Sequence, residues 1–152
     1  MATVVVINGR HRGEWYTIPD TPRGLVVGRD DKLLAEVIDP RVSHQHLRLF
    51  RDPKTARYTL EDLGSRNGTR VNGQKVQFHD LEEHDLIQIG HTLLAYTATD
   101  VGNEDAVENF VEKMRGKAGS TLDQIEKREE YTEAAALFSR IFRKPGSDKK
   151  KR

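Results

Sequence analysis

The chain has no cysteine in its 152 residues. This absence excludes disulfide bonds, thiolate catalysis and cysteine-based zinc sites, and it suits a reducing compartment. Long hydrophobic runs are also missing at the start of the sequence. The apolar stretch there runs only from Val4 to Ile7, and no basic segment precedes it. That stretch is too short for a signal peptide or a membrane span. We therefore expect a cytoplasmic protein with no membrane partner.

Signatures of the common enzyme classes are missing as well. There is no Gly-x-Ser-x-Gly, no Walker loop and no Gly-x-Gly-x-x-Gly. Residues 64–68, Gly-Ser-Arg-Asn-Gly, look like a phosphate-cradling loop, but no Lys-Ser or Lys-Thr follows them. Paired carboxylates such as Glu82-Glu83 are typical of a solvated face. We therefore expect no catalytic residue and no cofactor.

The formal net charge of +1 hides an uneven layout. Residues 140–152 hold seven Lys or Arg and one Asp, whereas residues 101–139 have a net charge of −4 and residues 1–100 a net charge of −1. Because the first hundred residues are nearly neutral, their charge does not indicate a specific nucleic-acid partner. A rival function, nucleic-acid or membrane binding through the basic tail, has little support, since the tail is short and lacks aromatic residues after Phe142.

The first hundred residues have the pattern of an all-β domain. Short runs rich in β-branched, leucine and aromatic residues alternate with turn signals, and the dipeptide Asn-Gly occurs three times. Many short strands with frequent turns predict a sandwich or a barrel. The expected strands cover residues 3–7, 14–18, 25–29, 46–51, 58–62, 86–90 and 92–98.

A helical extension is expected after about residue 104. Val107, Phe110, Val111 and Met114 recur at helical spacing and form one apolar stripe. The sequence 116–120, Gly-Lys-Ala-Gly-Ser, predicts a break, after which a second helix carries apolar residues up to Phe142. We therefore divide the chain into a β domain at 1–100, a helical extension at 101–144 and a disordered basic tail at 145–152.

Four short motifs occur in order on the predicted loops. They are Gly28-Arg29, the Ser-His-Gln-His of residues 43–46, the Ser-Arg-Asn-Gly-Thr of residues 65–69, and the Val-Asn-Gly of residues 71–73. Each motif alone is weak, but the ordered set over residues 24–92 resembles the forkhead-associated (FHA) domain family. This resemblance implies an antiparallel β-sandwich of about eleven strands that binds phosphothreonine peptides through loops at one end.

The residue types suit a phosphate ligand. A phosphothreonine carries roughly −1.5 to −2 charge and three acceptor oxygens. Arg29 offers a planar fork of donors that stays protonated, and Ser43 offers a hydroxyl. The alternatives are an Arg29 paired with Asp30, Asp31 or Asp39, and a Ser43 that only forms a turn.

The resemblance assigns further roles. It implies that Asn67 grips the peptide backbone, that Arg66 and His44 lie near the phosphate, and that Arg41 reads a residue three positions after the phosphothreonine, with a preference for an acidic or polar side chain. Exposed loop residues, or an Arg41 paired with Asp39, are the alternatives. Structural roles are expected for five further residues of the motifs: Gly28, His46, Gly68, Asn72 and Gly73. A metal site at His44 and His46 is not expected, because no third ligand lies nearby.

The sequence thus predicts a non-catalytic signalling adaptor that recruits a partner phosphorylated on threonine by a Ser/Thr kinase. An alternative function is an FHA-like scaffold acting mainly through its helices, with residues 104–142 used for self-association or for docking a partner.

Overall fold

The computed structural model describes residues 1–142, with side chains described up to Arg128. The predicted tail at 145–152 lies outside these residues, and so do the apolar side chains expected from Tyr131 to Phe142. Two compact units are distinguished: the first is Met1–Lys117 and the second begins at Ala118. No helix within residues 1–142 has both the length and the apolar character needed to span a membrane.

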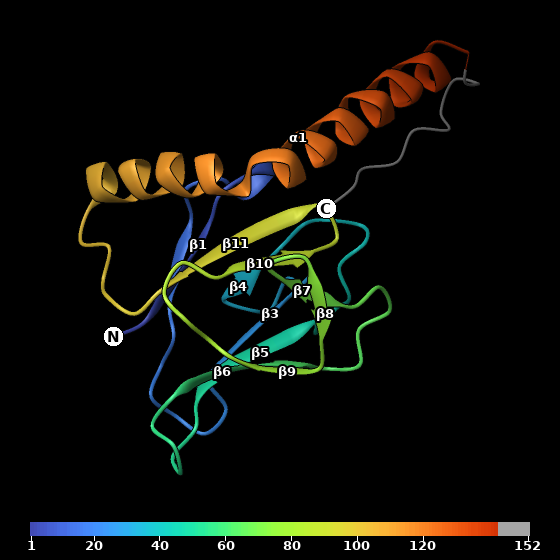
Figure 1. Ribbon diagram of the computed structural model, residues 1–152. Coiled ribbons are helices and arrows are strands. Elements are labelled where there is room, and N and C mark those ends of the chain that lie inside the picture. The colour runs from blue at the N-terminus through green and yellow to red at the C-terminus, as the bar shows by residue number, and fades with distance from the viewer. Residues whose placement is uncertain (143–152) are drawn as a thin grey trace. The chain divides into compact units, whose positions relative to one another are not determined.

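The first unit is built on eleven described strands in two sheets (Figure 1). One sheet has the order β2-β1-β11-β10-β7-β8 and the other has the order β4-β3-β5-β6-β9. This arrangement is the β-sandwich that the sequence predicts. The strands are β1 (Thr3–Val6), β2 (Trp15–Thr17), β3 (Leu25–Gly28), β4 (Ala35–Glu36), β5 (Leu47–Arg51), β6 (Tyr58–Asp62), β7 (Thr69–Val71), β8 (Gln74–Val76), β9 (Phe78–Asp80), β10 (Leu86–Ile89) and β11 (Thr92–Thr97), with a short 3₁₀ helix η1 (Gly9–His11) after β1.

All seven strands expected from apolar runs are present, each within two residues of its predicted ends. The other four strands, β4, β7, β8 and β9, are two or three residues long. The described pairings are antiparallel except for β3 with β4, which run parallel. The antiparallel sandwich is therefore confirmed, with one parallel pair at the edge of the second sheet.

The core lies between the sheets and follows the two-residue period of the strands. In β1, Val4 and Val6 belong to the central hydrophobic cluster. Val5 and Ile7 are also fully buried, but they lie outside that cluster. Because alternate side chains of a strand point to opposite faces, the outer face of β1 must be covered by another element.

The start of helix α1 (Glu104–Phe142) covers this outer face (Figure 1). Val107, Val111 and Met114, three of the four residues of the predicted stripe, are buried. Arg115 donates from Nη1 to the Ile7 carbonyl at 3.0 Å, which ties the helix to the end of β1. Asn103 caps the helix, since its Oδ1 accepts from the Ala106 amide at 2.9 Å. The first turns of α1 are thus part of the first unit.

The predicted break in the helix is smaller than expected. The helix continues through Gly116, and only Gly119 has a non-helical conformation, with φ 50° and ψ −120°. Glycine reaches this positive φ without a steric penalty from a Cβ atom, so a single residue is enough to bend the chain. The predicted break at residues 116–120 therefore includes the observed one, but it is longer than the single non-helical residue in the structure.

Candidate functional site

Three segments meet at one end of the sandwich: the residues after β3, the loop between β4 and β5, and the loop between β6 and β7. Gly28, the last residue of β3, allows the first two segments to approach closely. A Cβ atom at Gly28 would lie 2.1 Å from the His44 carbonyl oxygen. The Arg29 amide then donates to the Ser43 carbonyl at 2.9 Å, which places Arg29 directly beside the Ser43 backbone.

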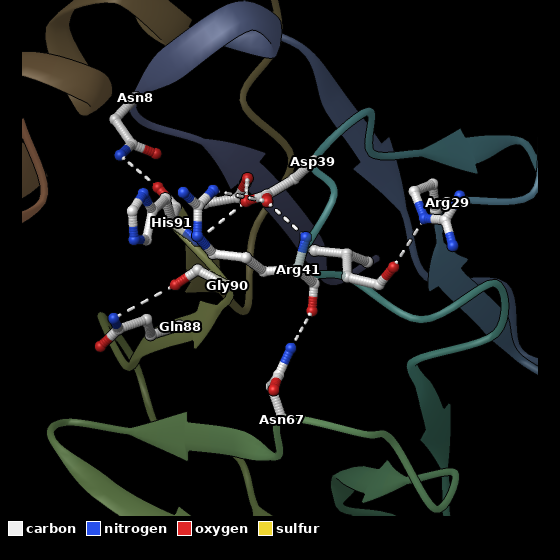
Figure 2. Close-up of polar contacts among 10 residues, drawn as sticks. Asn8, Arg29, Asp39, Arg41, Asn67, Gln88, Gly90 and His91 are labelled. Carbon is white, nitrogen blue, oxygen red and sulfur yellow. Dashed lines mark hydrogen bonds and ion pairs between the residues drawn. The ribbon is translucent and has the colours of Figure 1, made fainter. Parts of the chain in front are cut away.

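The Arg29 side chain is held from two sides. Its Nε donates to the Val42 carbonyl at 2.9 Å, a contact shown in Figure 2. Its Nη2 lies 3.4 Å from Nε2 of His44, an exposed residue. Both contacts are made to the loop between β4 and β5, and together they orient the guanidinium N–H donors of Arg29 at this end of the sandwich.

Ser43 connects the second and third segments. Its Oγ accepts a hydrogen bond from the Arg66 amide at 3.0 Å. A serine hydroxyl has one proton to donate and two lone pairs that accept. Because the Arg66 amide occupies an acceptor position, the hydroxyl proton can still be donated to a ligand.

His46 lies under the loops and bridges them. The side chain is fully buried, Nδ1 accepts from the Ser43 amide at 3.0 Å, and Nε2 lies 2.9 Å from the Gly68 carbonyl oxygen. A ring nitrogen that accepts a hydrogen bond carries no proton, so the ring proton lies on Nε2. Nε2 therefore donates a hydrogen bond to the Gly68 carbonyl oxygen. This tautomer joins the Ser43 loop to the Asn67-Gly68 turn.

Asp62, the last residue of β6, organises the third segment and was not predicted. Its Oδ1 accepts from the hydroxyls of Ser65 and Thr69, and its Oδ2 accepts from the Ser65 amide at 2.9 Å. Burial by itself would raise the pKa of Asp62, but these hydrogen bonds outweigh burial and lower the pKa below its ordinary 3.8. The Asp-x-x-Ser spacing is the signal that could have identified this turn.

Asn67 and Arg41 meet across the second and third segments (Figure 2). Asn67 donates from Nδ2 to the Arg41 carbonyl at 2.8 Å. The Arg41 side chain lies against Asp39, with Nη1 3.4 Å from Oδ1. This contact is the alternative pairing considered for Arg41 in the sequence. Asp39 itself had no assigned role in the site.

The predicted Asn72-Gly73 turn lies apart from these contacts. Both residues have positive φ, 50° and 87°, in the tight hairpin between β7 and β8. Asn72 donates from Nδ2 to Asp85 at 2.9 Å, and its Oδ1 accepts from the Leu86 amide at 3.0 Å. The side chain therefore braces the start of β10.

A separate apolar groove of about 380 Å³ lies beside the start of β3. Its lining includes Leu25, Leu33 and the exposed Leu34. None of the predicted site residues lines this groove.

His44 and His46 do not share a face, as they would in a regular strand. His44 is exposed and His46 is buried, because β5 begins only at Leu47. Both ring nitrogens of His46 are already occupied by loop contacts. Within the described part of the chain, no group of three or more His, Cys, Asp or Glu residues is placed to hold a metal ion.

The β-sandwich, with Arg29, Ser43 and Asn67 on loops at one end, is the architecture that the resemblance to FHA domains implies. Residues 25–90 match the model of the FHA domain family. This match over residues 25–90 confirms the resemblance to FHA domains that the motifs indicate.

Among curated proteins, the chain is similar to the FHA domain-containing protein FhaA of Mycobacterium tuberculosis (strain ATCC 25618 / H37Rv), with 37% identity over 67 residues. This match covers 44% of the chain but only 12% of FhaA.

Two solved structures share the fold at moderate identity. One comes from a study of phosphothreonine-dependent FHA domain interactions; it has a TM-score of 0.57, 28% identity, and coverage of 65% of this chain and 97% of that one. The other is the FhaA FHA domain complexed with the intracellular domain of Rv3910, with a TM-score of 0.55, 29% identity, and coverage of 63% and 99%.

Proposed function

We propose that this chain is a non-catalytic phosphothreonine-peptide-binding adaptor. The arrangement of Arg29, Ser43 and the Arg66 amide carries the proposal. Arg29 is hydrogen-bonded to the backbone of Ser43, and the Ser43 hydroxyl is hydrogen-bonded to Arg66. Support also comes from the similarity to FHA domains solved in a study of phosphothreonine-dependent interactions and in complex with a partner.

The chemistry of the site suits a phosphate dianion. The guanidinium of Arg29 supplies a charged fork, and the Ser43 hydroxyl supplies a second donor. A hydrogen bond to a charged group contributes roughly 1.5–3 kcal/mol, so two or three of them support weak, reversible binding. His44 and Arg66 lie on the same segments and add positive or polar groups beside the phosphate.

The Asn67 amide serves the peptide backbone beside the phosphothreonine. Its Nδ2 is directed to the Arg41 carbonyl, and its Oδ1 offers an acceptor to a peptide N–H. Arg41 contributes on the same side, where it reads a residue that follows the phosphothreonine. Gly28, His46, Gly68, Asn72 and Gly73 act on the shape of the loops and turns and make no direct contact with the peptide.

The biological role follows from the binding mode. A Ser/Thr kinase phosphorylates the partner, and the domain then binds that partner. Any second protein that the rest of the chain binds is thereby brought close to the phosphorylated partner, so that the effective concentration of each protein near the other rises. In the proposed division, residues 1–100 bind the peptide, residues 101–144 form the extension and residues 145–152 the tail. The apolar residues Val107, Val111 and Met114 are buried, and so are Leu122 and Ile125, so none of these five side chains is free to dock a partner.

Calorimetry on the full chain tests the proposal. The ligands are a degenerate peptide set centred on phosphothreonine, the same set with phosphoserine, and an unmodified threonine set. We expect the phosphothreonine set to bind most tightly. Arg29→Ala should weaken that binding by roughly 10- to 150-fold, the equivalent of one charge-assisted hydrogen bond.

Arg57→Ala is the matched control, because Arg57 is an exposed arginine on the β5–β6 hairpin and its contact with Asp80 is 3.9 Å long. This variant should bind as the unmodified chain does. Equal affinity for the phosphorylated and unmodified sets would contradict the proposal. Hydrolysis of a generic phosphoester that disappears in Ser43→Ala would favour an enzyme instead.

A further inference from the structure

Asp39 is a buried carboxylate whose two oxygens receive four hydrogen bonds (Figure 2). Oδ1 accepts from the Arg41 amide at 3.0 Å and from Arg41 Nη1 at 3.4 Å. Oδ2 accepts from the His91 amide at 2.8 Å and from the Thr92 hydroxyl at 3.0 Å. Both oxygens act only as acceptors, which is the pattern of an ionised carboxylate.

The position of Asp39 is closely enclosed by the turn between β10 and β11. A Cβ atom at Gly90 would lie 2.8 Å from Asp39 Oδ2 and 2.9 Å from the Arg41 Cβ. Asn8 holds the far side of the turn, because its Nδ2 donates to the His91 carbonyl at 2.9 Å and its Oδ1 accepts from the Leu93 amide at 2.8 Å. The carboxylate therefore has a defined place that does not depend on a ligand.

This arrangement fixes Arg41 in two ways. Asp39 holds the Arg41 amide and contacts its guanidinium, while the Arg41 carbonyl accepts from Asn67. The guanidinium charge, on a side chain that is 37% exposed, thus lies beside a carboxylate that is only 7% exposed. A negative group of a ligand that approaches Arg41 also approaches Asp39, which cancels part of the attraction.

We propose that Asp39 is a specificity-determining residue that holds and neutralises Arg41, so that the peptide-binding surface beside Asn67 does not favour acidic residues after the phosphothreonine. The inference rests on the proposed phosphopeptide function and refines what Arg41 recognises. The remaining guanidinium donors of Arg41 still serve neutral acceptors such as amides and hydroxyls. Selectivity at Arg41 is therefore for neutral polar side chains.

The test uses pairs of phosphothreonine peptides that differ only by Asp or Asn at one of the four positions after the phosphothreonine. For the unmodified chain, the two affinities should agree within about threefold at each position, as expected for a neutralised and partly solvated pair. In Asp39→Asn the Asp peptide should gain at least about fivefold over the Asn peptide at one position, because the repelling charge is removed. The double variant with Arg41→Ala should lose this gain.

A second variant is needed because Asn at position 39 has only one acceptor oxygen. Its NH2 group cannot accept the hydrogen bonds that one of the two Asp39 oxygens receives, so the loop can change shape in Asp39→Asn. Arg41→Gln keeps the Arg41 backbone contacts and removes only the cation. The carboxylate of Asp39 is then unopposed, and the Asp peptide should bind at least about threefold more weakly than the Asn peptide. Asp52→Asn is the matched control, because Asp52 accepts from the Lys54 amide on the distant β5–β6 hairpin, and it should change no ratio.

A preference of the unmodified chain for Asp above tenfold, lost in Arg41→Gln, would overturn the inference and show that Arg41 reads acidic residues directly. Equal weakening of both peptides in Asp39→Asn, with an unchanged ratio in Arg41→Gln, would reduce Asp39 to a structural residue. These results leave the proposed function intact, because phosphorylated peptides still bind more tightly than unmodified ones. Loss of that difference in the unmodified chain would overturn both proposals.

Discussion

The backbone amide of Arg66 donates to the Ser43 hydroxyl oxygen at 3.0 Å, across 23 residues of sequence. Ser43 therefore has a place in the fold before any ligand binds. The contact orients the hydroxyl and joins the two loops that carry the candidate phosphate-binding groups. Such an orientation before binding lowers the entropy cost of fixing these groups around a ligand.

Ser43→Ala should weaken phosphothreonine-peptide binding by roughly 10-fold or more, because both the donor to the phosphate and the acceptor for Arg66 are removed. Thr55→Ala is the control, since Thr55 also accepts a backbone amide, that of Arg57, in the β5–β6 hairpin. Calorimetry should show unchanged affinity for the control. If Ser43→Ala bound as tightly as the unmodified chain, the hydroxyl would have no part in recognition.

Gly28→Ala should destabilise the first unit by about 3 kcal/mol or more. The added Cβ would lie 2.1 Å from the His44 carbonyl oxygen and 2.9 Å from that of Ser43, so the backbone would have to move. Gly116→Ala, in the exposed part of α1 with no atom within 4 Å of the new Cβ, should be neutral or stabilise by up to about 1 kcal/mol. Urea denaturation of both variants measures the difference, and similar values would refute the close approach.

Asp62→Asn should lower the stability at neutral pH by about 1–3 kcal/mol, because hydrogen bonds to a buried carboxylate are lost. The pKa of Asp62 is lowered in the folded chain. Its stabilising contribution is therefore present above the ordinary pKa of 3.8, which applies in the unfolded chain, and disappears as the pH falls through the lower folded pKa. Denaturation curves between pH 2 and pH 6 should be flatter for Asp62→Asn than for the unmodified chain. A variant with an unchanged pH profile would contradict this linkage.

Met114→Ala should destabilise the first unit by about 2–5 kcal/mol, since Met114 is fully buried at the start of α1. Lys113→Ala, at the neighbouring exposed position, should change the stability by less than about 0.5 kcal/mol. Thermal unfolding compares the two. Equal effects would mean that α1 is not part of the folded unit.

The apolar runs in the sequence predicted all six strands of four or more residues and also the three-residue β2, but not the other short strands, β4, β7, β8 and β9. Strand β5, with the sequence Leu-Arg-Leu-Phe-Arg, buries Leu47 and Leu49. Because alternate positions of such a strand are buried, its apolar residues tend to recur at every second position of the sequence. In β8, Gln74 and Lys75 are exposed and only Val76 is half-buried. The edge strand β8 is held by backbone pairing and therefore has no such period in its sequence.

Prediction of the site was limited in the same way. Arg29, Ser43 and Asn67 could be named as candidate binding residues because they belong to an ordered set of motifs. Asp39 was not assigned to the site, because its partners His91 and Thr92 lie 52 and 53 residues away in the sequence. A carboxylate in a loop has the same local sequence whether it is solvated or receives four hydrogen bonds.

Residue order alone therefore determined the all-β character of the first hundred residues, the position of the helices and the types of donor available to a phosphate, since these depend on local period and side-chain chemistry. Tertiary structure decided which of those side chains meet. It placed the Arg66 amide on Ser43, the His46 ring between two loops and the Arg41 guanidinium on Asp39. These contacts form because the sheets bring together segments that are distant in the sequence. A local stretch of sequence does not show which distant residues will lie next to it.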